Sequence, residues 1–288
     1  MIKTSDKSSE IKPIHYLCNG KTLTFSSPLI MAIVNITPDS FYDGGKFSDI
    51  KDVLNDVEDK IAQGAQIIDI GAASTRPGAE TLEVEEEWTR LAHILPEIRK
   101  KFPNTFISVD TFRADIAKRS VALGVDIIND ISGGNLDEDM LDTVCKLNVP
   151  YILMHLDGDP QNMQHNAPYL NVAESVHQKF EKQIHLFQSK GFNKIILDPG
   201  FGFGKSLRNN YELLKALSQF KNMGYPVLAG VSRKSMINKV IHSNPVTALN
   251  GTTVLNTIAL LNGAAILRVH DVQEAKQAIE LVSYYQNA

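Results

Sequence analysis

The sequence predicts an α/β fold, a single (β/α)₈ TIM barrel preceded by an N-terminal β-hairpin. Three observations carry this prediction: eight short apolar runs recur along the chain, helical segments separate them, and the runs end in polar residues. A chain of 288 residues is long enough for such a barrel as one domain. We therefore expect one domain over residues 1–288, with the barrel over about 29–286 and the hairpin over 14–26.

The eight runs are the expected strands. They are rich in isoleucine, leucine and valine and are apolar on both faces, as in a parallel sheet that helices cover. Their expected positions are 29–37, 65–71, 105–111, 126–132, 151–156, 194–200, 226–232 and 264–271.

The segments between the runs have apolar residues every three or four positions, which is typical of helices packed on a sheet. The pattern is clearest at 84–102, 173–191 and 272–285. An open, doubly wound sheet has the same alternation and is the alternative topology. Glycine often follows a helical segment just before the next strand, where a left-handed cap ends a helix; these positions are Gly64, Gly124, Gly191, Gly224 and Gly263.

The hairpin prediction rests on the segment HYLCNGKTLTF, which precedes the first barrel strand. Asn19-Gly20 separates two strand-like runs there, and this dipeptide favours a tight turn between antiparallel strands. We expect the hairpin to cover the bottom of the barrel.

Composition and charge exclude several classes of protein. The chain has no apolar run long enough to span a membrane, and its start, MIKTSDKSSE, lacks the apolar core of a signal peptide, so we expect a cytoplasmic protein. A net charge of −4 argues against broad nucleic-acid binding. Cys18 and Cys145 are too few and too isolated for a disulfide framework or a zinc site. Small molecules are therefore the expected partners, with neither nucleic acid nor membrane.

The stretch LDPGFGFGKS, residues 197–206, resembles a phosphate-binding loop at first sight. Gly204, Lys205 and Ser206 match the end of that motif, but Pro199 stands where the first glycine is required. The alternating glycines also fail to match a dinucleotide-binding fingerprint. The stretch needs another explanation.

Barrel enzymes carry their active sites at the carboxyl ends of the strands, and here these ends gather complementary polar groups. Asp110, Asn129 and Asp198 offer acceptors for a flat heterocycle with N–H donors. Four cations or potential cations suit an anionic leaving group: Arg76, Lys234, Arg268 and His270. Singly, each of these residues is as well explained by a helix cap or a loop contact.

The motifs NITPDSF, STRPGA, SVDT, INDIS, LMH, LDPGFGFGK, SRKS and RVHDV, in this order, resemble the dihydropteroate synthase family of folate biosynthesis. The resemblance implies a TIM-barrel enzyme, usually a homodimer, that is inhibited by sulfonamides. It would join 6-hydroxymethyl-7,8-dihydropterin pyrophosphate to p-aminobenzoate with Mg²⁺ bound, releasing pyrophosphate.

The resemblance also implies roles for individual residues. Asp198 would accept hydrogen bonds from the pterin 2-amino group and N3–H, while Asp110 and Asn129 complete the contacts. Lys234 would bond the carbonyl edge of the pterin, and Met154 would pack on the ring. Pyrophosphate would bind Arg268, which also stacks on the ring, together with His270, Asn35 and Thr75, and Asn35 would contact Mg²⁺.

We expect a dissociative, SN1-like substitution, in which cations stabilise the departing pyrophosphate and the aminobenzoate amine attacks the cation left behind. The catalytic groups would be Asp39, Arg76, Lys234, Arg268 and His270. The aminobenzoate pocket would be shaped by Phe41, Arg76, Pro77, Phe203 and Ser235.

Three alternatives to the synthase stay open at this point. A related pterin-binding methyltransferase domain shares the pterin contacts but does not need Arg268 and His270 for pyrophosphate. A non-catalytic pterin-binding homologue and an open-sheet phosphate-binding protein are the others. The chain departs from the usual motifs of the family at Ala73 and at Asp157, which leaves loop details and drug sensitivity open.

Overall fold

The barrel strands carry six of the predicted site residues, Asn35, Asp110, Asn129, Met154, Asp198 and Arg268. The computed structural model describes residues 13–36, 47–72, 82–156 and 169–288. Eight parallel strands form one sheet in the order β8-β7-β6-β5-β4-β3-β10-β9, and a bridge between Leu197 and Val227 joins its two ends. The predicted (β/α)₈ barrel is therefore confirmed, and the open sheet is wrong. The strands are β3 (Leu29–Asn35), β4 (Ile67–Gly71), β5 (Phe106–Asp110), β6 (Ile127–Asp130), β7 (Tyr151–Met154), β8 (Ile195–Asp198), β9 (Leu228–Ala229) and β10 (Ile266–Val269).

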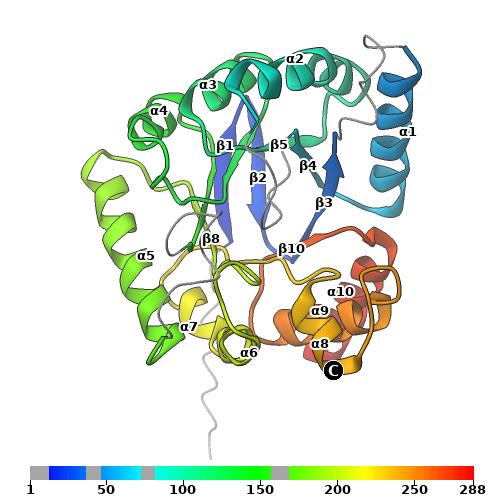
Figure 1. The fold of residues 1–288 in the computed structure, drawn as a ribbon, viewed down its shortest axis with the longest axis vertical. Helices are drawn as coiled ribbons and strands as arrows, with labels where there is room; N and C mark the ends of the chain where they lie inside the picture. The colour runs from blue at the N-terminus through cyan, green and yellow to red at the C-terminus, as the bar shows by residue number, and fades with distance from the viewer. Residues whose placement is uncertain (1–12, 37–46, 73–81, 157–168) are drawn as a thin grey trace, which may run out of the picture.

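Helices surround the strands on the outside of the barrel, as Figure 1 shows. The segment after β8 carries two helices and so does the segment after β9, a departure from the expected strict alternation. The five glycines expected to end helices all have positive φ, and Asn148 and His242 take the same left-handed conformation after two other helices. The helices are α1 (Phe47–Gln63), α2 (Val84–Lys101), α3 (Ala114–Ala122), α4 (Met140–Leu147), α5 (Val172–Ser189), α6 (Leu207–Lys215), α7 (Leu217–Lys221), α8 (Ser235–Ile241), α9 (Leu249–Leu261) and α10 (Val272–Asn287).

The N-terminal hairpin closes the bottom of the barrel, as the sequence predicts. Strands β1 (Ile14–Cys18) and β2 (Lys21–Phe25) pair antiparallel around Asn19-Gly20. The hydroxyl of Tyr16 donates a hydrogen bond of 2.8 Å to the carbonyl of Ile195 at the start of β8. Buried side chains of the hairpin pack on the lower layer of the barrel interior, which consists of Leu29, Met31, Ile67, Ile127, Ile152, Ile196, Leu228 and Ile266.

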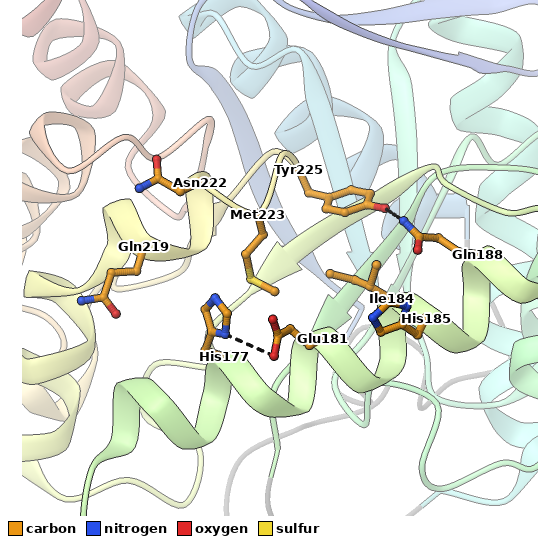
Figure 2. A pocket seen from close by; sticks show the side chains of 9 residues that line it. All are labelled: His177, Glu181, Ile184, His185, Gln188, Gln219, Asn222, Met223 and Tyr225. Carbon is orange, nitrogen blue, oxygen red and sulfur yellow. Dashed lines mark hydrogen bonds and ion pairs between the residues drawn. The ribbon is translucent and has the colours of Figure 1, made fainter.

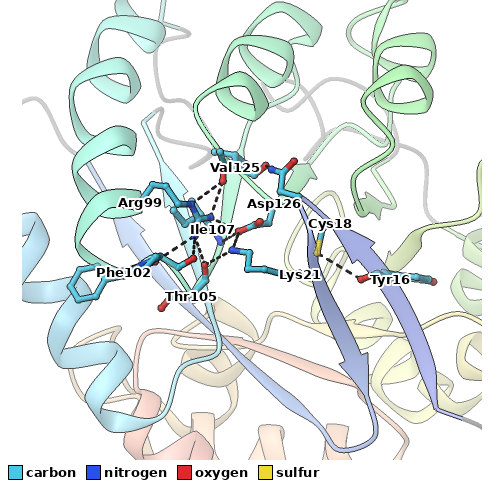
Figure 3. A network of polar contacts seen from close by, with 12 residues as sticks. Tyr16, Cys18, Lys21, Arg99, Phe102, Thr105, Ile107, Val125 and Asp126 are labelled. Carbon is cyan, nitrogen blue, oxygen red and sulfur yellow. Dashed lines mark hydrogen bonds and ion pairs between the residues drawn. The ribbon is translucent and has the colours of Figure 1, made fainter.

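A buried ion network fixes the hairpin to the barrel (Figure 3). Asp126, just before β6, is fully buried and accepts hydrogen bonds from Lys21 at 2.8 Å, from the backbone N–H of Ile107 at 2.9 Å and from Arg99 of α2. Removing one partner from such a buried network strongly destabilises a fold. The hairpin thus covers the bottom end of the barrel and is held there by ion pairs. A ligand can therefore enter only from the opposite end, at the carboxyl ends of the strands.

No helix within the described residues is long and apolar enough to cross a membrane.

Candidate active site at the carboxyl ends of the strands

Strand register brings three predicted site residues onto one inner face of the barrel. Asn35 pairs with Gly71, Gly71 with Asp110, and Asp110 with Asn129 across four neighbouring strands. Paired residues in a parallel sheet point to the same face, so these side chains lie in a row. Gly71 leaves room within the row, because a Cβ there would lie 3.2 Å from the amide oxygen of Asn35.

Met154 and Asp198 are paired in the same way on β7 and β8. Met154 packs in a small apolar cluster with Ile131 and Leu156, against which Phe112 and Phe203 lie. The predicted ring-packing methionine therefore stands beside a buried carboxylate and within a largely apolar wall.

Arg268 of β10 lies across the barrel interior between two carboxylates. Its Nε donates to Asp69 of β4 at 2.7 Å, and its Nη2 donates to Asp110 at 3.0 Å. Asn129 donates from its amide nitrogen to the same Asp69 oxygen at 3.1 Å. Predicted site residues from three strands thus form one hydrogen-bonded network.

Asp69 is the member of this network that sequence reasoning missed. It is fully buried. A signal was present, because an acidic residue in the middle of the apolar run AQIIDIG is rare unless it has a partner inside the fold.

The turn after β8 explains the stretch that resembles a phosphate-binding loop. Asp198 accepts a hydrogen bond of 2.8 Å from the backbone N–H of Gly200, and Gly200 has a φ of 71°. A side chain at Gly200 would collide with the carbonyl oxygen of His155, so only glycine fits this turn. The backbone there serves the buried carboxylate.

Lys205 has a structural role in the turn after β8. Its ammonium group donates to the carbonyl oxygens of His155 at 3.2 Å, Gly200 at 2.9 Å and Phe203 at 3.0 Å. It therefore holds the glycine-rich turn against the end of β7.

Lys234 is the cation that reaches the interior beside this turn. Its ammonium group donates to the carbonyl oxygen of Phe201 and lies 4.9 Å from the centre of the Phe203 ring. It is close enough to Asp198, Arg268 and Asp110 for their charges to affect its pKa. Asp198 and Arg268 likewise influence each other's pKa, so these charges share one interior space.

Burial brings the pKa values of Asp110 and Lys234 close to 7 and 8. Desolvation raises the pKa of Asp110 to about 7, although Arg268 opposes the rise. Desolvation lowers the pKa of Lys234 to about 8, against the effect of Asp198. The pKa of Asp198 is raised by burial. Burial disfavours the charged form of Arg268, but Asp69 and Asp110 outweigh it and the pKa of Arg268 is raised.

The rim of the barrel carries more exposed predicted residues: Asn35, Ser235 and His270. The backbone N–H of His270 donates to the Ser232 hydroxyl at 3.3 Å. Partial desolvation and the nearby Arg268 charge lower the pKa of His270, so it is largely neutral at pH 7. Asp39, Phe41, Thr75, Arg76 and Pro77 lie outside the described residues.

Three other polar residues at the strand ends have structural partners. Asp130 accepts from the Tyr151 hydroxyl at 2.7 Å, Arg233 pairs with Asp271 at 2.7 Å, and His155 packs beside Tyr169 and Phe180. These contacts bind helices and loops to the barrel. Asp130, Arg233 and His155 are therefore not members of the network around Arg268.

A hollow of about 320 Å³ lies outside the barrel between α5 and the segment around α7 (Figure 2). His177 and Glu181 approach to 3.7 Å in it, and Gln188 donates to the Tyr225 hydroxyl at 3.0 Å. It contains none of the predicted site residues, so it is distinct from the barrel site.

The chemistry of the barrel site follows from these contacts. Its inner row offers carboxylate and amide groups to a polar ring, and its apolar cluster offers packing for a flat surface. Arg268 and Lys234 supply positive charge beside them, where a departing anion would be stabilised.

Known proteins resemble this chain over nearly its whole length. Residues 31–270 match the model of the pterin binding enzyme family. The chain is 41% identical to dihydropteroate synthase of Haemophilus influenzae, over 94% of this chain and 98% of that protein. It is 36% identical to Yersinia pestis dihydropteroate synthase, solved in a sulfonamide drug complex, with a TM-score of 0.87 over 95% and 99% of the two chains. The Xanthomonas albilineans enzyme in complex with 7,8-dihydropteroate is 33% identical, with a TM-score of 0.84 over 96% and 100%.

Proposed function

Since the chain belongs to the pterin-binding enzyme family, as a dihydropteroate synthase, we propose that Asp110, Asn129, Asp198, Lys234 and Arg268 form its pterin site. The enzyme is a transferase that condenses 6-hydroxymethyl-7,8-dihydropterin pyrophosphate with p-aminobenzoate. The observation that carries the site assignment is the hydrogen-bonded network of Arg268, Asp110 and Asn129 around Asp69, with Asp198 and Lys234 near enough to Arg268 for its charge to affect their pKa values.

The ring contacts follow from donor and acceptor chemistry. Asp198 uses Oδ1 for Gly200, and its carboxylate has further acceptor capacity for the 2-amino group and N3–H of the pterin. Asp110 and Asn129 extend the row of polar groups, and Lys234 donates to the carbonyl edge. Met154 covers one face of the ring within its apolar cluster.

Pyrophosphate binds beside Arg268, with His270 and Thr75 as further donors. Asn35 fits a Mg²⁺ contact, because the residue is exposed at the rim and its amide oxygen lies close to Gly71. A hard cation that keeps most of its waters needs only one or two protein oxygens. When bound, Mg²⁺ neutralises charge on the pyrophosphate.

The bond from the pterin methylene to pyrophosphate breaks first in this mechanism. Arg268 and His270 hold the departing anion, and the electron-rich ring delocalises the positive charge left on the methylene carbon. The family resemblance implies that the Asp39 carboxylate would favour that charge. The neutral amine of p-aminobenzoate then attacks, and the proton that it loses passes to solvent or to pyrophosphate.

p-Aminobenzoate occupies the mouth of the barrel. Phe203 supplies one wall, supported by the cation of Lys234 at 4.9 Å. Ser235 is exposed at the start of α8, and the family resemblance implies that Phe41, Arg76 and Pro77 would complete the pocket. Sulfonamides resemble p-aminobenzoate in shape, so we expect them to compete for this pocket, in agreement with the drug complex of the Yersinia pestis relative.

A single reaction tests the function. The purified chain is incubated with the pterin pyrophosphate, p-aminobenzoate and Mg²⁺, while pteroate formation and pyrophosphate release are followed together. Equal amounts of both products support the proposal. Binding of the pterin without turnover, or methyl transfer from methyltetrahydrofolate to a corrinoid protein, would contradict it.

The kcat/KM for the pterin substrate is expected to follow a bell-shaped pH profile. Below about pH 7 the Asp110 carboxyl is protonated and loses acceptor capacity; above about pH 8 Lys234 loses its charge. Measurements of kcat/KM over roughly pH 5.5 to 9.5 cover both limbs of the profile, and these limbs report the pKa values of groups in the free enzyme. Asp110→Asn should lower kcat/KM and abolish the acidic limb. An acidic limb that persists in this variant would refute the assignment to Asp110.

We further propose a homodimer. Neighbouring helices α9 and α10 expose large apolar side chains: Val254, Ile258, Leu261, Leu281, Tyr284 and Tyr285. An apolar surface of this kind favours burial against a second copy.

Light scattering after size exclusion is expected to give twice the chain mass of 31.9 kDa. Leu261→Lys combined with Leu281→Lys should shift the enzyme to the monomer, because two charges would be buried unpaired in the interface. Leu170→Lys, at an exposed leucine before α5, is the control and should leave the mass unchanged. A monomeric wild-type protein would exclude this interface. A cytoplasmic location is also part of the proposal; Cys18 and Cys145 are free thiols, as a reducing compartment favours.

A further inference from the structure

Asp69 has no assigned contact with either substrate, yet it joins two residues that do. It lies in the middle of β4 with no exposed surface. Its Oδ2 accepts hydrogen bonds from Arg268 Nε and Asn129 Nδ2, at 2.7 Å and 3.1 Å. Among the described residues, its Oδ1 has no hydrogen-bond partner.

The bond from Asn129 fixes the orientation of its amide group. An amide has donors on one side and an acceptor on the other. Because the nitrogen of Asn129 is directed at Asp69, its oxygen is directed away from Asp69. Without an acceptor at position 69, the amide would be free to rotate and to present its nitrogen instead.

The bonds from Arg268 fix the plane of the guanidinium group. Asp69 Oδ2 lies 2.7 Å from both Nε and Nη2, and Asp110 accepts from Nη2 at 3.0 Å. Two carboxylates along one edge of a planar group leave it little freedom to turn. Loss of either carboxylate would release one end of it.

Such an arrangement costs stability, because a buried carboxylate with an unbonded oxygen loses more hydration than its partners restore. An apolar side chain at position 69 would match the rest of β4. A residue that is costly in the fold but holds two site residues in place is typical of a role in function.

We propose that Asp69 is a positioning residue for the pterin substrate, which sets the amide orientation of Asn129 and the plane of Arg268. This inference deepens the proposed function and rests on it. Asp69 acts through the two residues that contact the pterin side of the reaction, so its loss should impair that substrate and spare p-aminobenzoate.

Asp69→Asn tests the proposal, since it keeps the size of the side chain and removes the charge. The kcat/KM for the pterin pyrophosphate should fall about 10- to 100-fold, as for a buried hydrogen bond to a charged group. The KM for p-aminobenzoate should change by less than about twofold.

Asp126→Asn is the matched control. Asp126 is equally buried and binds two cations, but at the opposite end of the barrel. It should lower the melting temperature and leave both KM values and kcat unchanged. If Asp69→Asn yields no folded protein, Asp69→Ser, whose smaller side chain leaves space for a water molecule, is measured in the same way.

The experiment distinguishes a failure of the proposed function from a failure of the proposed role of Asp69. Turnover by the wild-type enzyme reports the proposed function, and the ratio of variant to wild-type constants reports the role of Asp69. A pterin-specific loss supports the proposal. Wild-type kinetics in the Asp69 variant, or equal losses for both substrates, would overturn it.

Discussion

Asp198→Ala is expected to lower kcat/KM for the pterin pyrophosphate about a thousandfold. Asp198 is the acceptor for two N–H groups of the ring in the proposed site, and each such charged hydrogen bond contributes about 1.5–3 kcal/mol. Its removal has a second effect, because the Asp198 charge raises the pKa of Lys234. Without it, more Lys234 is neutral at pH 7 and the carbonyl edge of the pterin loses its cation.

Steady-state pyrophosphate release and calorimetric binding of the pterin substrate measure this effect. Asp198→Asn is the control for shape, since it keeps one oxygen for Gly200 but replaces the other acceptor with a donor. It should be nearly as impaired as the alanine variant. Unchanged binding in both variants would show that the ring does not contact Asp198.

Arg268→Ala is expected to lower kcat/KM by a similar factor and also to destabilise the protein. The activity falls because the departing pyrophosphate loses a cation. The fold weakens because Asp69 is fully buried and loses its charged partner. Breaking a buried ion pair in this way costs about 3–5 kcal/mol, and the partial exposure of Arg268 favours the lower end of that range.

Urea denaturation measures the stability and pyrophosphate release measures the activity. Arg268→Lys separates the two effects, because lysine keeps the charge but cannot donate to both carboxylates in one plane. It should recover more stability than activity. An Arg268→Ala protein as stable as the wild type would show that the ion pair with Asp69 contributes nothing to the fold.

The sequence predicts the barrel well because each strand is an apolar run that ends in polar residues. Asp110, Asn129 and Asp198 each follow a buried apolar run, and parallel strands bring such residues together at one end. The hairpin was also predictable, since Asn19-Gly20 specifies its turn. The residues within each segment were sufficient to predict the strands and the hairpin.

Contacts between distant segments were beyond sequence reasoning. The role of Asp69 depends on Arg268, 199 positions later. Lys205 could be a solvated loop residue until three carbonyl oxygens are seen around it. The strand predicted at 226–232 contains only Leu228–Ala229, because the chain pairs with β10 over two residues there. Each outcome depends on the closed barrel rather than on the local segment.

The N-terminal cap has a consequence for how the chain is made. A ribosome releases Tyr16 and Lys21 early, but their partners, Ile195 and Asp126, emerge much later. The hairpin cannot find its complete packing surface until β10 has left the exit tunnel. A segment that is synthesised before the barrel strands is therefore among the last to dock, and its apolar side stays uncovered until then.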